Sequence, residues 1–338
     1  MAIINTSKLI TIDRYLEAKE HEHPEATGDF TNILHDLVLS FRLISLEIRR
    51  AGINDILGLT ENTNSAGDKV HKLDEFANDV FFKMMSRSGN LCVMASEESE
   101  DVIDIPDNYK KGKYVLIFDP LDGSTNIDAG IAIGSIFSLY KRLDTNSDSN
   151  GTIIDVLQPG YKQTAAGYIL YGSSTILVYT TGEGVNVFTY DHTIGEFLLT
   201  YEKLTIPQRG SMYSCNESHY FEWDDKIRRY LDYIKTPTSD GKHPYITRYV
   251  ATIVADIHRM LNYGGIYLYP PNTRAANGKI RLLYEANPLA MIIEQAGGKA
   301  TTGTQRILDM IPESIHQQIP FYAGSVDDVN ELEKFLKN

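Results

Sequence analysis

The sequence predicts an α/β or α+β protein in which helices cover the faces of sheets. Two observations favour this class. Helical patterns of apolar residues occur near the start of the chain and again in its last third, and short apolar runs typical of strands lie between them. The chain has 338 residues, 42% of them hydrophobic, which is enough for one large domain or two ordinary ones.

Two amphipathic helices are predicted in the first quarter of the chain. Apolar side chains recur at helical spacing over residues 30–48, and the Ala-Gly pair at 51–52 ends the pattern. A second helical pattern covers residues 72–85. The connection between them, residues 54–71, is rich in Gly, Asn, Thr, Ser and Asp, which predicts a mobile functional loop.

The pattern changes to short apolar runs after residue 90. Residues 91–95 and 114–118 predict buried strands, and a cluster of acids follows each of them. Further strands, several in a meandering sheet, are expected at residues 131–140, 165–170, 175–180, 185–190, 265–269 and 282–284, and further helices at residues 223–234, 247–261, 288–296 and 326–336. A boundary is predicted at residues 206–210, Ile-Pro-Gln-Arg-Gly, which divides the chain into residues 1–206 and 207–338.

The charge balance argues against nucleic acid and anionic membranes as partners. Lys and Arg number 32 against 45 Asp and Glu, so the net charge is −13 and the surface as a whole repels polyanions. No apolar run reaches the roughly 18 residues of a membrane span. The two cysteines, Cys92 and Cys215, lie far apart among apolar or small residues, which predicts buried, reduced thiols. With no apolar leader at the N-terminus, a cytoplasmic protein is expected.

The strongest chemical signal is residues 118–126, Phe-Asp-Pro-Leu-Asp-Gly-Ser-Thr-Asn, directly after a predicted strand. Asp119 and Asp122 stand three residues apart on a Pro/Gly turn, where their carboxylates would repel each other unless a hard cation such as Mg²⁺ lay between them. The amides of Gly123 and Ser124 then offer a cradle for a phosphate. Cation ligands beside an anion cradle are the minimum for phosphoryl transfer.

Two further acidic groups extend this signal. Glu97 and Glu98 follow the strand predicted at residues 91–95, and Asp68 and Asp74 flank the start of the second helix. Acids at several strand and loop ends suggest two or three metal ions that clamp the attacking water and the leaving oxygen. Each group alone has a plainer interpretation: an Asp-Pro-x-Asp-Gly turn is more often only a turn, a Glu pair is usually a solvated face, and Asp68 or Asp74 could cap a helix.

Taken together and in order, these motifs resemble a known family. The Asp119–Ser124 motif with the upstream Glu pair is similar to the lithium-sensitive, Mg²⁺-dependent phosphatases that include the inositol monophosphatases. Further stretches, at residues 67–74, 248–249, 254–259, 264–270 and 278–285, narrow the resemblance to class I fructose-1,6-bisphosphatase over nearly the whole chain. The resemblance implies a layered αβαβα sandwich and a homotetramer. It also implies Mg²⁺-dependent hydrolysis of the 1-phosphate of D-fructose 1,6-bisphosphate in gluconeogenesis.

The resemblance assigns roles to the acids and the turn. It implies two to three Mg²⁺ ions per subunit, with Mn²⁺ or Zn²⁺ as possible substitutes, on Glu97, Glu98, Asp119, the Leu121 carbonyl, Asp122 and Glu285. Asp68 would complete the site when the loop at 54–71 closes. Glu98 and Asp74 would orient and deprotonate water, and Gly123 with Ser124 would hold the 1-phosphate.

The resemblance also implies a pocket for the distal phosphate and an effector site. The distal pocket is expected to contain Asn216, Tyr220, Arg248 from a neighbouring subunit, Tyr249, Tyr269 and Lys279. AMP, an inhibitor in the family, would bind Thr27, Gly28, Asp29, Thr31, Lys113 and Tyr114. Residues 26–31 open the helix predicted at residues 30–48, whose N-terminal amides suit an anion, although this segment could equally be a helix cap. Asp29 and Lys141 stand where the family usually has Glu and Arg.

Two alternatives remain open from the sequence. A sedoheptulose-1,7-bisphosphatase would use the same metal chemistry on a sugar that is one carbon longer. A regulator on the same fold could bind cations or nucleotides without catalysis. Such a regulator would be expected to lose the water-activating acids first, and Asp74 and Glu98 are both present.

Overall fold

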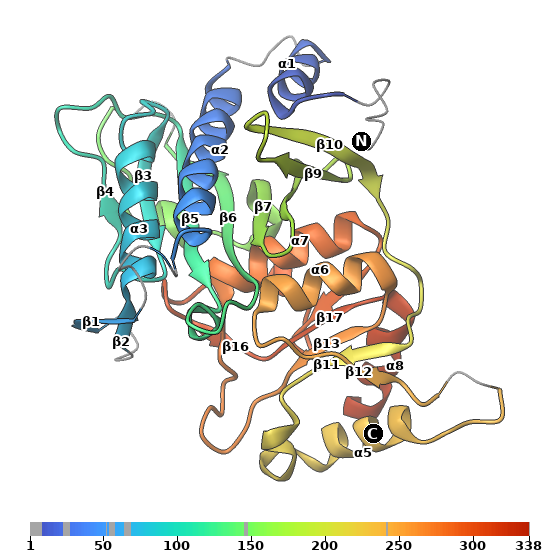
Figure 1. Ribbon diagram of the computed structural model, residues 1–338. Coiled ribbons are helices and arrows are strands. Elements are labelled where there is room, and N and C mark those ends of the chain that lie inside the picture. The colour runs from blue at the N-terminus through green and yellow to red at the C-terminus, as the bar shows by residue number, and fades with distance from the viewer. Residues whose placement is uncertain are drawn as a thin grey trace.

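The computed structural model describes residues 9–22, 28–51, 53, 58–63, 69–144, 148–240 and 243–337 (Figure 1). Its centre is a twisted eight-stranded sheet with the strand order β10-β9-β8-β7-β6-β5-β3-β4. Only β3 and β5 pair in parallel among these neighbours; the other pairs are antiparallel. The strands are β3 (Leu91–Ser96), β4 (Ile103–Asp104), β5 (Tyr114–Asp122), β6 (Ile133–Lys141), β7 (Gln163–Tyr171), β8 (Thr175–Thr180), β9 (Val185–Asp191) and β10 (Glu196–Leu204).

A smaller, five-stranded sheet is built from the later part of the chain. Its order is β12 (Ile246–Thr247), β11 (Met212–Ser214), β13 (Ile266–Tyr269), β17 (Phe321–Gly324) and β15 (Lys299–Thr301). Two strand pairs stand apart from both sheets. They are β1 (Leu59–Thr63) with β2 (Lys69–His71), and β14 (Ile280–Arg281) with β16 (Gln318–Ile319).

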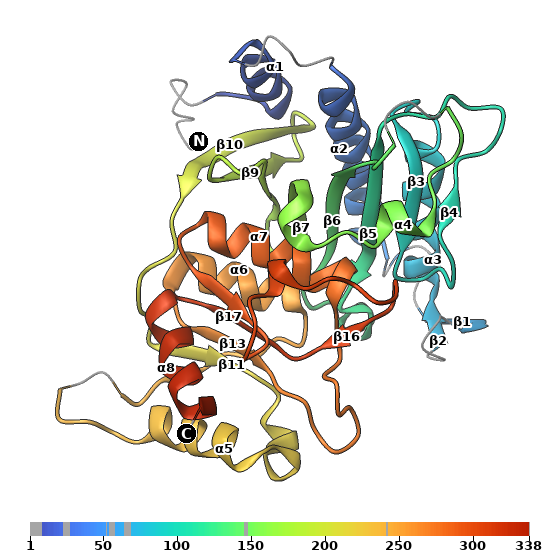
Figure 2. The ribbon, with the colours of Figure 1, turned by 180° about the vertical axis from the view of Figure 1, so that it is seen from behind.

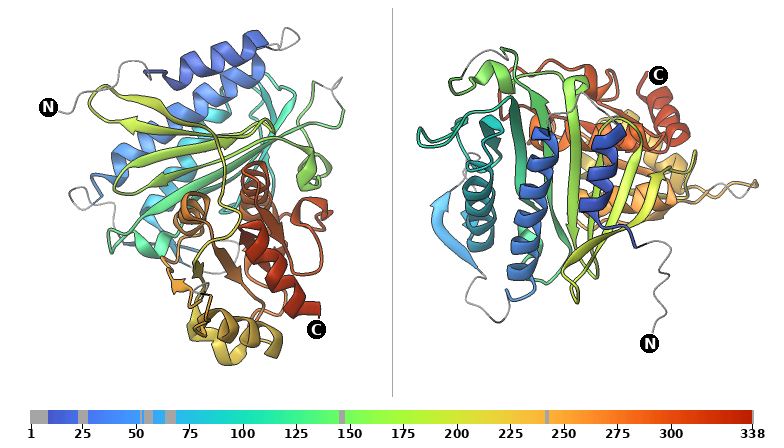
Figure 3. Two further views of the ribbon diagram at one scale, coloured as in Figure 1. Left: turned by 90° about the vertical axis from the view of Figure 1, so that its right-hand side faces the viewer. Right: turned by 90° about the horizontal axis from the view of Figure 1, so that it is seen from above.

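Helices and sheets alternate in five layers, which Figure 3 shows edge-on. On the outer face of the large sheet lie α1 (Ile12–Glu22), α2 (Asp29–Ile48) and α3 (Lys72–Met85). Between the sheets lie α6 (Ile253–Tyr263) and α7 (Asn287–Gln295), and on the far side of the small sheet lie α5 (Asp225–Lys235) and α8 (Val326–Lys337). The expected αβαβα sandwich is confirmed.

Short helical turns connect these layers. Seen from behind in Figure 2, α4 (Ile153–Val156) lies beside β5. The others are the 3₁₀ turns η2 (Ser124–Asn126), η3 (Gly160–Lys162), η4 (Glu217–Glu222) and η6 (Ile307–Asp309), and the π-helix η5 (Leu282–Ala286). None of the helices in the described ranges is both long and apolar enough to cross a membrane.

Aromatic packing fixes α2 and α3 on the large sheet. The ring of Phe41 in α2 lies 5.9 Å from Phe81 in α3 and 5.7 Å from Phe137 in β6. Phe81 in turn stacks on Phe118 of β5 at 4.6 Å. These rings are buried, and they account for the helical apolar spacing that predicted both helices. The same packing fixes α3 over the strands whose ends carry the acids.

Three expectations for the later and loop segments need correction. The strand predicted at residues 282–284 is wrong, because the strand β14 ends at Arg281 and the π-helix η5 follows. All three residues are buried, so no polar position was present to distinguish helical spacing from the alternation of a strand. The helix predicted from residue 247 begins only at Ile253, since Ala251 has a φ of 65°. Within residues 54–71, predicted as a loop, the described residues form the hairpin β1–β2.

Candidate active site

The acids that follow two neighbouring strands meet at one edge of the large sheet. β3 and β5 run in parallel with Ser96 opposite Phe118, so both strands lead to the same edge. The ladder continues one step further, because the backbone N–H of Glu97 donates to the Phe118 carbonyl at 3.1 Å. Glu97 is therefore held next to Asp119, as the pattern of acids after apolar runs predicted.

Three carboxylates converge at this edge. Oxygen atoms of Asp119, Asp122 and Glu285 all lie within 4.8 Å of one another. Each is oriented by a backbone amide. Leu121 donates to Asp119 Oδ1 at 3.0 Å, Val254 to Asp122 Oδ2 at 3.0 Å, and Arg281 to Glu285 Oε2 at 2.6 Å.

The three acids come from two different parts of the fold. Asp119 and Asp122 end β5 in the large sheet, while Glu285 lies in η5. The amide that holds Asp122 belongs to the first turn of α6, where the helix dipole also favours negative charge. The cluster therefore lies at the junction of the large sheet and the layer of helices between the sheets.

The electrostatics of this cluster favour a cation. Burial raises the pKa of Asp119 well above its ordinary value, and the charges of Glu97, Asp122 and Glu285 raise it further. Burial likewise raises the pKa of Asp122 to about 7 and that of Glu285 to about 8. Several neighbouring carboxylates cannot all ionise cheaply without a counterion. Oxygen donors of this kind suit Mg²⁺ or Mn²⁺, so the residues fit the metal that the sequence predicts.

Arg281 connects the two acidic groups and is the main functional residue that sequence reasoning missed. Its Nε donates to Glu97 Oε1 at 2.5 Å, while its backbone N–H holds Glu285. The side chain is only 8% exposed, so the ion pair lies largely out of water. The available signal was its position four residues before Glu285 in the stretch at 278–285.

Asp74 lies beside Glu97 at the first turn of α3. Its carboxylate is 3% exposed, and Oδ2 accepts from the His71 backbone N–H at 3.1 Å. Oδ1 has no hydrogen-bond partner among the described residues. Burial raises the pKa of Asp74 to about 7, with the Glu97 charge adding to the rise. Asp74 thus caps its helix, as the plainer interpretation expected, and is also a buried acid on which the charge of Glu97 acts.

Two neighbouring contacts fix the helix α3 and the Glu97–Glu98 pair relative to the end of β3. Ser96 Oγ at the end of β3 donates to Asn78 Oδ1 in α3 at 2.7 Å, and the Glu98 N–H donates back to Ser96 Oγ at 3.3 Å. Asp68, the remaining acid predicted here, lies outside the described residues.

The turn after Asp122 has a backbone that only glycine adopts easily. Gly123 has a φ of 83°, and a Cβ placed on it would lie 2.1 Å from Thr252 Oγ1. Asn126 Nδ2 donates to the same Thr252 Oγ1 at 2.7 Å and to the Val250 carbonyl at 3.0 Å. These contacts hold Gly123 and Ser124 against the segment that precedes α6. Both residues directly follow Asp122, a candidate metal ligand.

Two of the tyrosines predicted for a distal phosphate lie near the acids. Burial raises the pKa of Tyr249, and Tyr269 and Asp122 are among the charges that raise it further. Burial also raises the pKa of Tyr269, with Glu285 adding to it. Tyr249 is 36% exposed as a residue.

The other distal candidates have different surroundings. Arg248 is exposed and donates to its neighbouring Thr247 carbonyl at 2.9 Å, and Lys279 is exposed too. Asn216 Oδ1 accepts from Ser218 Oγ at 2.7 Å. Tyr220 faces α5, where its hydroxyl donates to Asp232 at 2.8 Å and Lys235 lies 5.2 Å from its ring centroid. Its contacts in the described part of the chain are thus with α5 and with neighbouring aromatic rings.

Residues predicted for an effector site come together at the start of α2. Gly28 caps the helix with a φ of 74°, and Asp29 and Thr31 lie in its first turn. The Phe30 ring lies 6.3 Å from Tyr114, and Asp29 helps burial to raise the pKa of Tyr114. Lys113 is exposed next to it. Thr27 lies outside the described residues.

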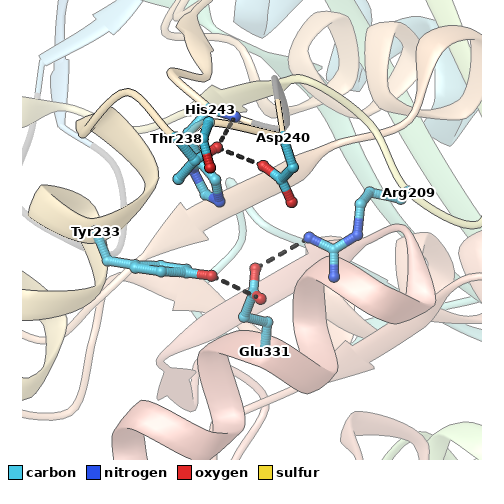
Figure 4. Close-up of a pocket in the computed structure, with 7 residues that line it drawn as sticks. Arg209, Tyr233, Thr238, Asp240, His243 and Glu331 are labelled. Carbon is cyan, nitrogen blue, oxygen red and sulfur yellow. Dashed lines mark hydrogen bonds and ion pairs between the residues drawn. The ribbon is translucent and has the colours of Figure 1, made fainter.

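A cavity of about 290 Å³ lies elsewhere, between α5, α8 and the chain around residue 240 (Figure 4). Its polar groups pair mainly with one another: Glu331 accepts from Arg209 at 3.0 Å and from Tyr233 at 3.3 Å, and Thr238 donates to Asp240 at 2.6 Å. None of the predicted site residues lines it. The candidate chemistry therefore lies at the sheet edge and not in this cavity.

Comparison with known proteins shows which family the chain resembles. The family model described as "Fructose-1-6-bisphosphatase, N-terminal domain" matches residues 10–202, and the corresponding C-terminal domain model matches residues 206–337. The class 1 fructose-1,6-bisphosphatase of Chlorobium chlorochromatii is 51% identical over 329 residues, covering 97% of this chain and 98% of the relative. That of Nitratidesulfovibrio vulgaris is 50% identical over 328 residues, covering 96% and 97%.

Solved structures give the same result. The holo form of Leishmania major fructose-1,6-bisphosphatase superposes with a TM-score of 0.91 at 38% identity, covering 98% of this chain and 99% of that one. Its T-state form superposes with a TM-score of 0.87 at the same identity and coverage. From its sequence, its layered fold and its cluster of acids, the chain belongs to the fructose-1,6-bisphosphatase family of enzymes.

Proposed function

We propose that the chain hydrolyses the 1-phosphate of D-fructose 1,6-bisphosphate to fructose 6-phosphate and inorganic phosphate. The observation that carries the proposal is the convergence of Asp119, Asp122 and Glu285 within 4.8 Å, next to the Gly123 turn. Relatives at about half identity over nearly their whole length carry the name of this activity, which supports the substrate.

The acids provide the ligands for two to three Mg²⁺ ions, with Mn²⁺ or Zn²⁺ as substitutes. Beside the three converging carboxylates, we assign Glu97, Glu98 and the Leu121 carbonyl to these ions. When bound, the ions would neutralise the carboxylates and stabilise charge on the phosphoryl and leaving oxygens. The raised pKa values of Asp122 and Glu285 support this, since a cation is what would let both ionise at neutral pH.

Asp74 and Glu98 are assigned to the attacking water. A carboxylate whose pKa is raised to about 7 can accept a proton from water near neutral pH, and Asp74 has that property. In the reaction the water oxygen forms a bond to phosphorus, the bond from phosphorus to the sugar oxygen breaks, and the sugar leaves as an alcohol. The amides of Gly123 and Ser124 bind the 1-phosphate, and Asp68 completes the set of acids.

The remaining predicted roles follow the family. Asn216, Tyr220, Tyr249, Tyr269 and Lys279 form the distal phosphate pocket, completed in a homotetramer by Arg248 of a neighbouring subunit. AMP inhibits by binding Thr27, Gly28, Asp29, Thr31, Lys113 and Tyr114; the closeness of Asp29 to Tyr114 supports this grouping. Residues 1–206 form the unit with the effector site and most metal ligands, and residues 207–338 form the sugar-phosphate unit. The enzyme works in gluconeogenesis in the cytoplasm.

The deciding experiment compares phosphate release from fructose 1,6-bisphosphate, sedoheptulose 1,7-bisphosphate and inositol 1-phosphate with Mg²⁺ present. Selective turnover of the fructose substrate that EDTA abolishes would support the proposal. Equal or faster turnover of the seven-carbon substrate would move the function to that sugar. No turnover of any of the three would favour the alternative of a regulator that binds ligands without catalysis. Adding AMP to the same assay tests the effector site.

A further inference from the structure

His316 contacts both of the segments that carry the acids proposed to bind metal. Its Nε2 is 2.9 Å from the carbonyl oxygen of Ser99, the residue after Glu98. Its Nδ1 is 3.4 Å from Nη1 of Arg281, which holds Glu97 and Glu285. One half-buried imidazole thus links the turn after β3 to the strand β14.

The two contacts specify the proton on this ring. A backbone carbonyl only accepts hydrogen bonds, so Nε2 must carry the hydrogen that it donates to Ser99. A guanidinium only donates, so Nδ1 must present a lone pair to Arg281. Both contacts are satisfied only by the neutral ring with its hydrogen on Nε2. A protonated ring would lose the Arg281 contact and place two cations side by side.

Backbone pairing fixes the ring in this position. His316 lies two residues before β16, in which Gln318 pairs with Arg281 of β14, and the Gln317 carbonyl accepts from the Leu282 N–H at 2.8 Å. The imidazole also lies against the Tyr284 ring, with centroids 5.4 Å apart. The residue that contacts Arg281 therefore lies just before the strand that pairs with it.

The charged groups that face the ring are Arg281 and Glu97, with the Tyr284 hydroxyl nearby. Burial lowers the pKa of His316, and the Arg281 charge lowers it further. The Ser99 and Glu100 backbone and the Glu97 charge act in the opposite direction. The net direction is downward, which favours the neutral ring at neutral pH.

We propose that His316 is a positioning residue of the metal site, which as the neutral Nε2–H tautomer holds Arg281 and the turn after Glu98 so that the Glu97 and Glu98 carboxylates stay oriented toward the ions. The proposal rests on the proposed metal site. Groups that orient metal ligands from behind typically change metal affinity by about 10–100-fold when removed. His316 itself touches neither substrate nor metal.

Two substitutions separate hydrogen bonding from packing. In His316→Gln, the side-chain amide can still donate to the Ser99 carbonyl and accept from Arg281, but it does not titrate. In His316→Leu, the bulk is roughly kept and both hydrogen bonds are lost. His192→Gln, in the turn between β9 and β10, is the matched control for the loss of an imidazole.

The readout is Mn²⁺ binding to the purified full-length protein by titration calorimetry, which does not depend on turnover. At about pH 7.5 we expect His316→Leu to bind Mn²⁺ about 10-fold more weakly than the unaltered protein. His316→Gln and His192→Gln should stay within about twofold of it.

Normal Mn²⁺ affinity in His316→Leu would overturn the proposal. An equal loss in His316→Gln and His316→Leu would also overturn it, because the loss would then follow the ring and not its hydrogen bonds. Turnover by the unaltered protein tests the proposed function separately. A protein that binds Mn²⁺ in this His316-dependent way but hydrolyses none of the three phosphates would contradict only the proposed function.

Discussion

Nε of Arg281 lies 2.5 Å from Oε1 of Glu97, although 184 residues separate them in the chain. The contact joins the segment after β3 to the strand β14, and the same arginine holds Glu285 through its backbone. A single buried cation thus offsets part of the negative charge of the cluster.

Glu98→Gln should lower kcat by about 10²–10⁴-fold, because it removes a proposed metal ligand and proton acceptor while keeping the volume of the side chain. Steady-state phosphate release measures the effect, and the thermal midpoint should hardly change. Glu100→Gln, an exposed acid two residues further on, is the control and should keep normal turnover. Normal turnover in Glu98→Gln would contradict the role of Glu98.

Arg248→Ala should raise KM for the bisphosphate by about tenfold and change kcat less, since a charge-assisted contact to the distal phosphate serves mainly to bind the ground state. Initial rates over a range of substrate concentrations give both constants. Arg274→Ala, which removes another exposed arginine, should leave both constants unchanged. An unchanged KM in Arg248→Ala would remove Arg248 from the pocket.

Gly123→Ala should destabilise the protein by about 2 kcal/mol or more and reduce kcat/KM. The substitution adds a Cβ 2.1 Å from Thr252 Oγ1 on top of a left-handed backbone conformation. Gly130→Ala is the matched control, because Gly130 also has a positive φ, 65°, but nothing lies within 4 Å of the added Cβ. It should cost only about 1 kcal/mol. Urea unfolding measures the stability of both variants. Equal losses of stability would show that Thr252 moves away from the added Cβ at little cost.

The stability of the metal-free protein should fall as pH rises from about 5 to 8. Burial raises the pKa of Asp74 and Asp122 from 3.8 to about 7 and that of Glu285 from 4.5 to about 8. The folded state therefore binds more protons than the unfolded state in this range. The contribution of these groups is complete below the unfolded pKa values and is lost as pH rises through the folded ones.

Urea unfolding with EDTA at several pH values measures this loss. Added Mg²⁺ should restore more stability at about pH 8 than at about pH 6, because its carboxylate ligands must be ionised. Stability that rises over this range in EDTA would contradict the raised pKa values. Asp74→Asn should flatten part of the slope, since it removes one titrating group.

Local sequence signals predicted the elements that carry most of the site. The helices around Phe41 and Phe81 followed from apolar spacing, because one face of each packs on the sheet. The acids after β3 and β5 followed from their position at strand ends, and the parallel pairing of those strands explains why they meet. These features depend on neighbours in the chain or on one strand pairing.

Local sequence signals could not predict the contacts between segments that are far apart in the chain. Neither Arg281 nor His316 lies in a pattern that reveals its partner, since each acts through a residue far away in the sequence. The π-helix η5 was mistaken for a strand because every side chain at 282–284 is buried between layers. Strands β11, β15 and β17 were not predicted, because short strands complete their apolar faces only within the assembled sheet. The longer strand β10 was also not predicted, because most of its residues are exposed or only partly buried.

The division of the acids between β5 and η5 has a consequence for how the protein is made. Synthesis on the ribosome proceeds from the N-terminus, so Glu97, Asp119 and Asp122 emerge long before Arg281 and Glu285. The nascent chain must therefore carry three neighbouring carboxylates without the arginine that offsets them. A shortened chain that stops before β14 would keep the repulsion and lack the fourth acid, so the ion binding that we propose would begin only when the C-terminal part has docked.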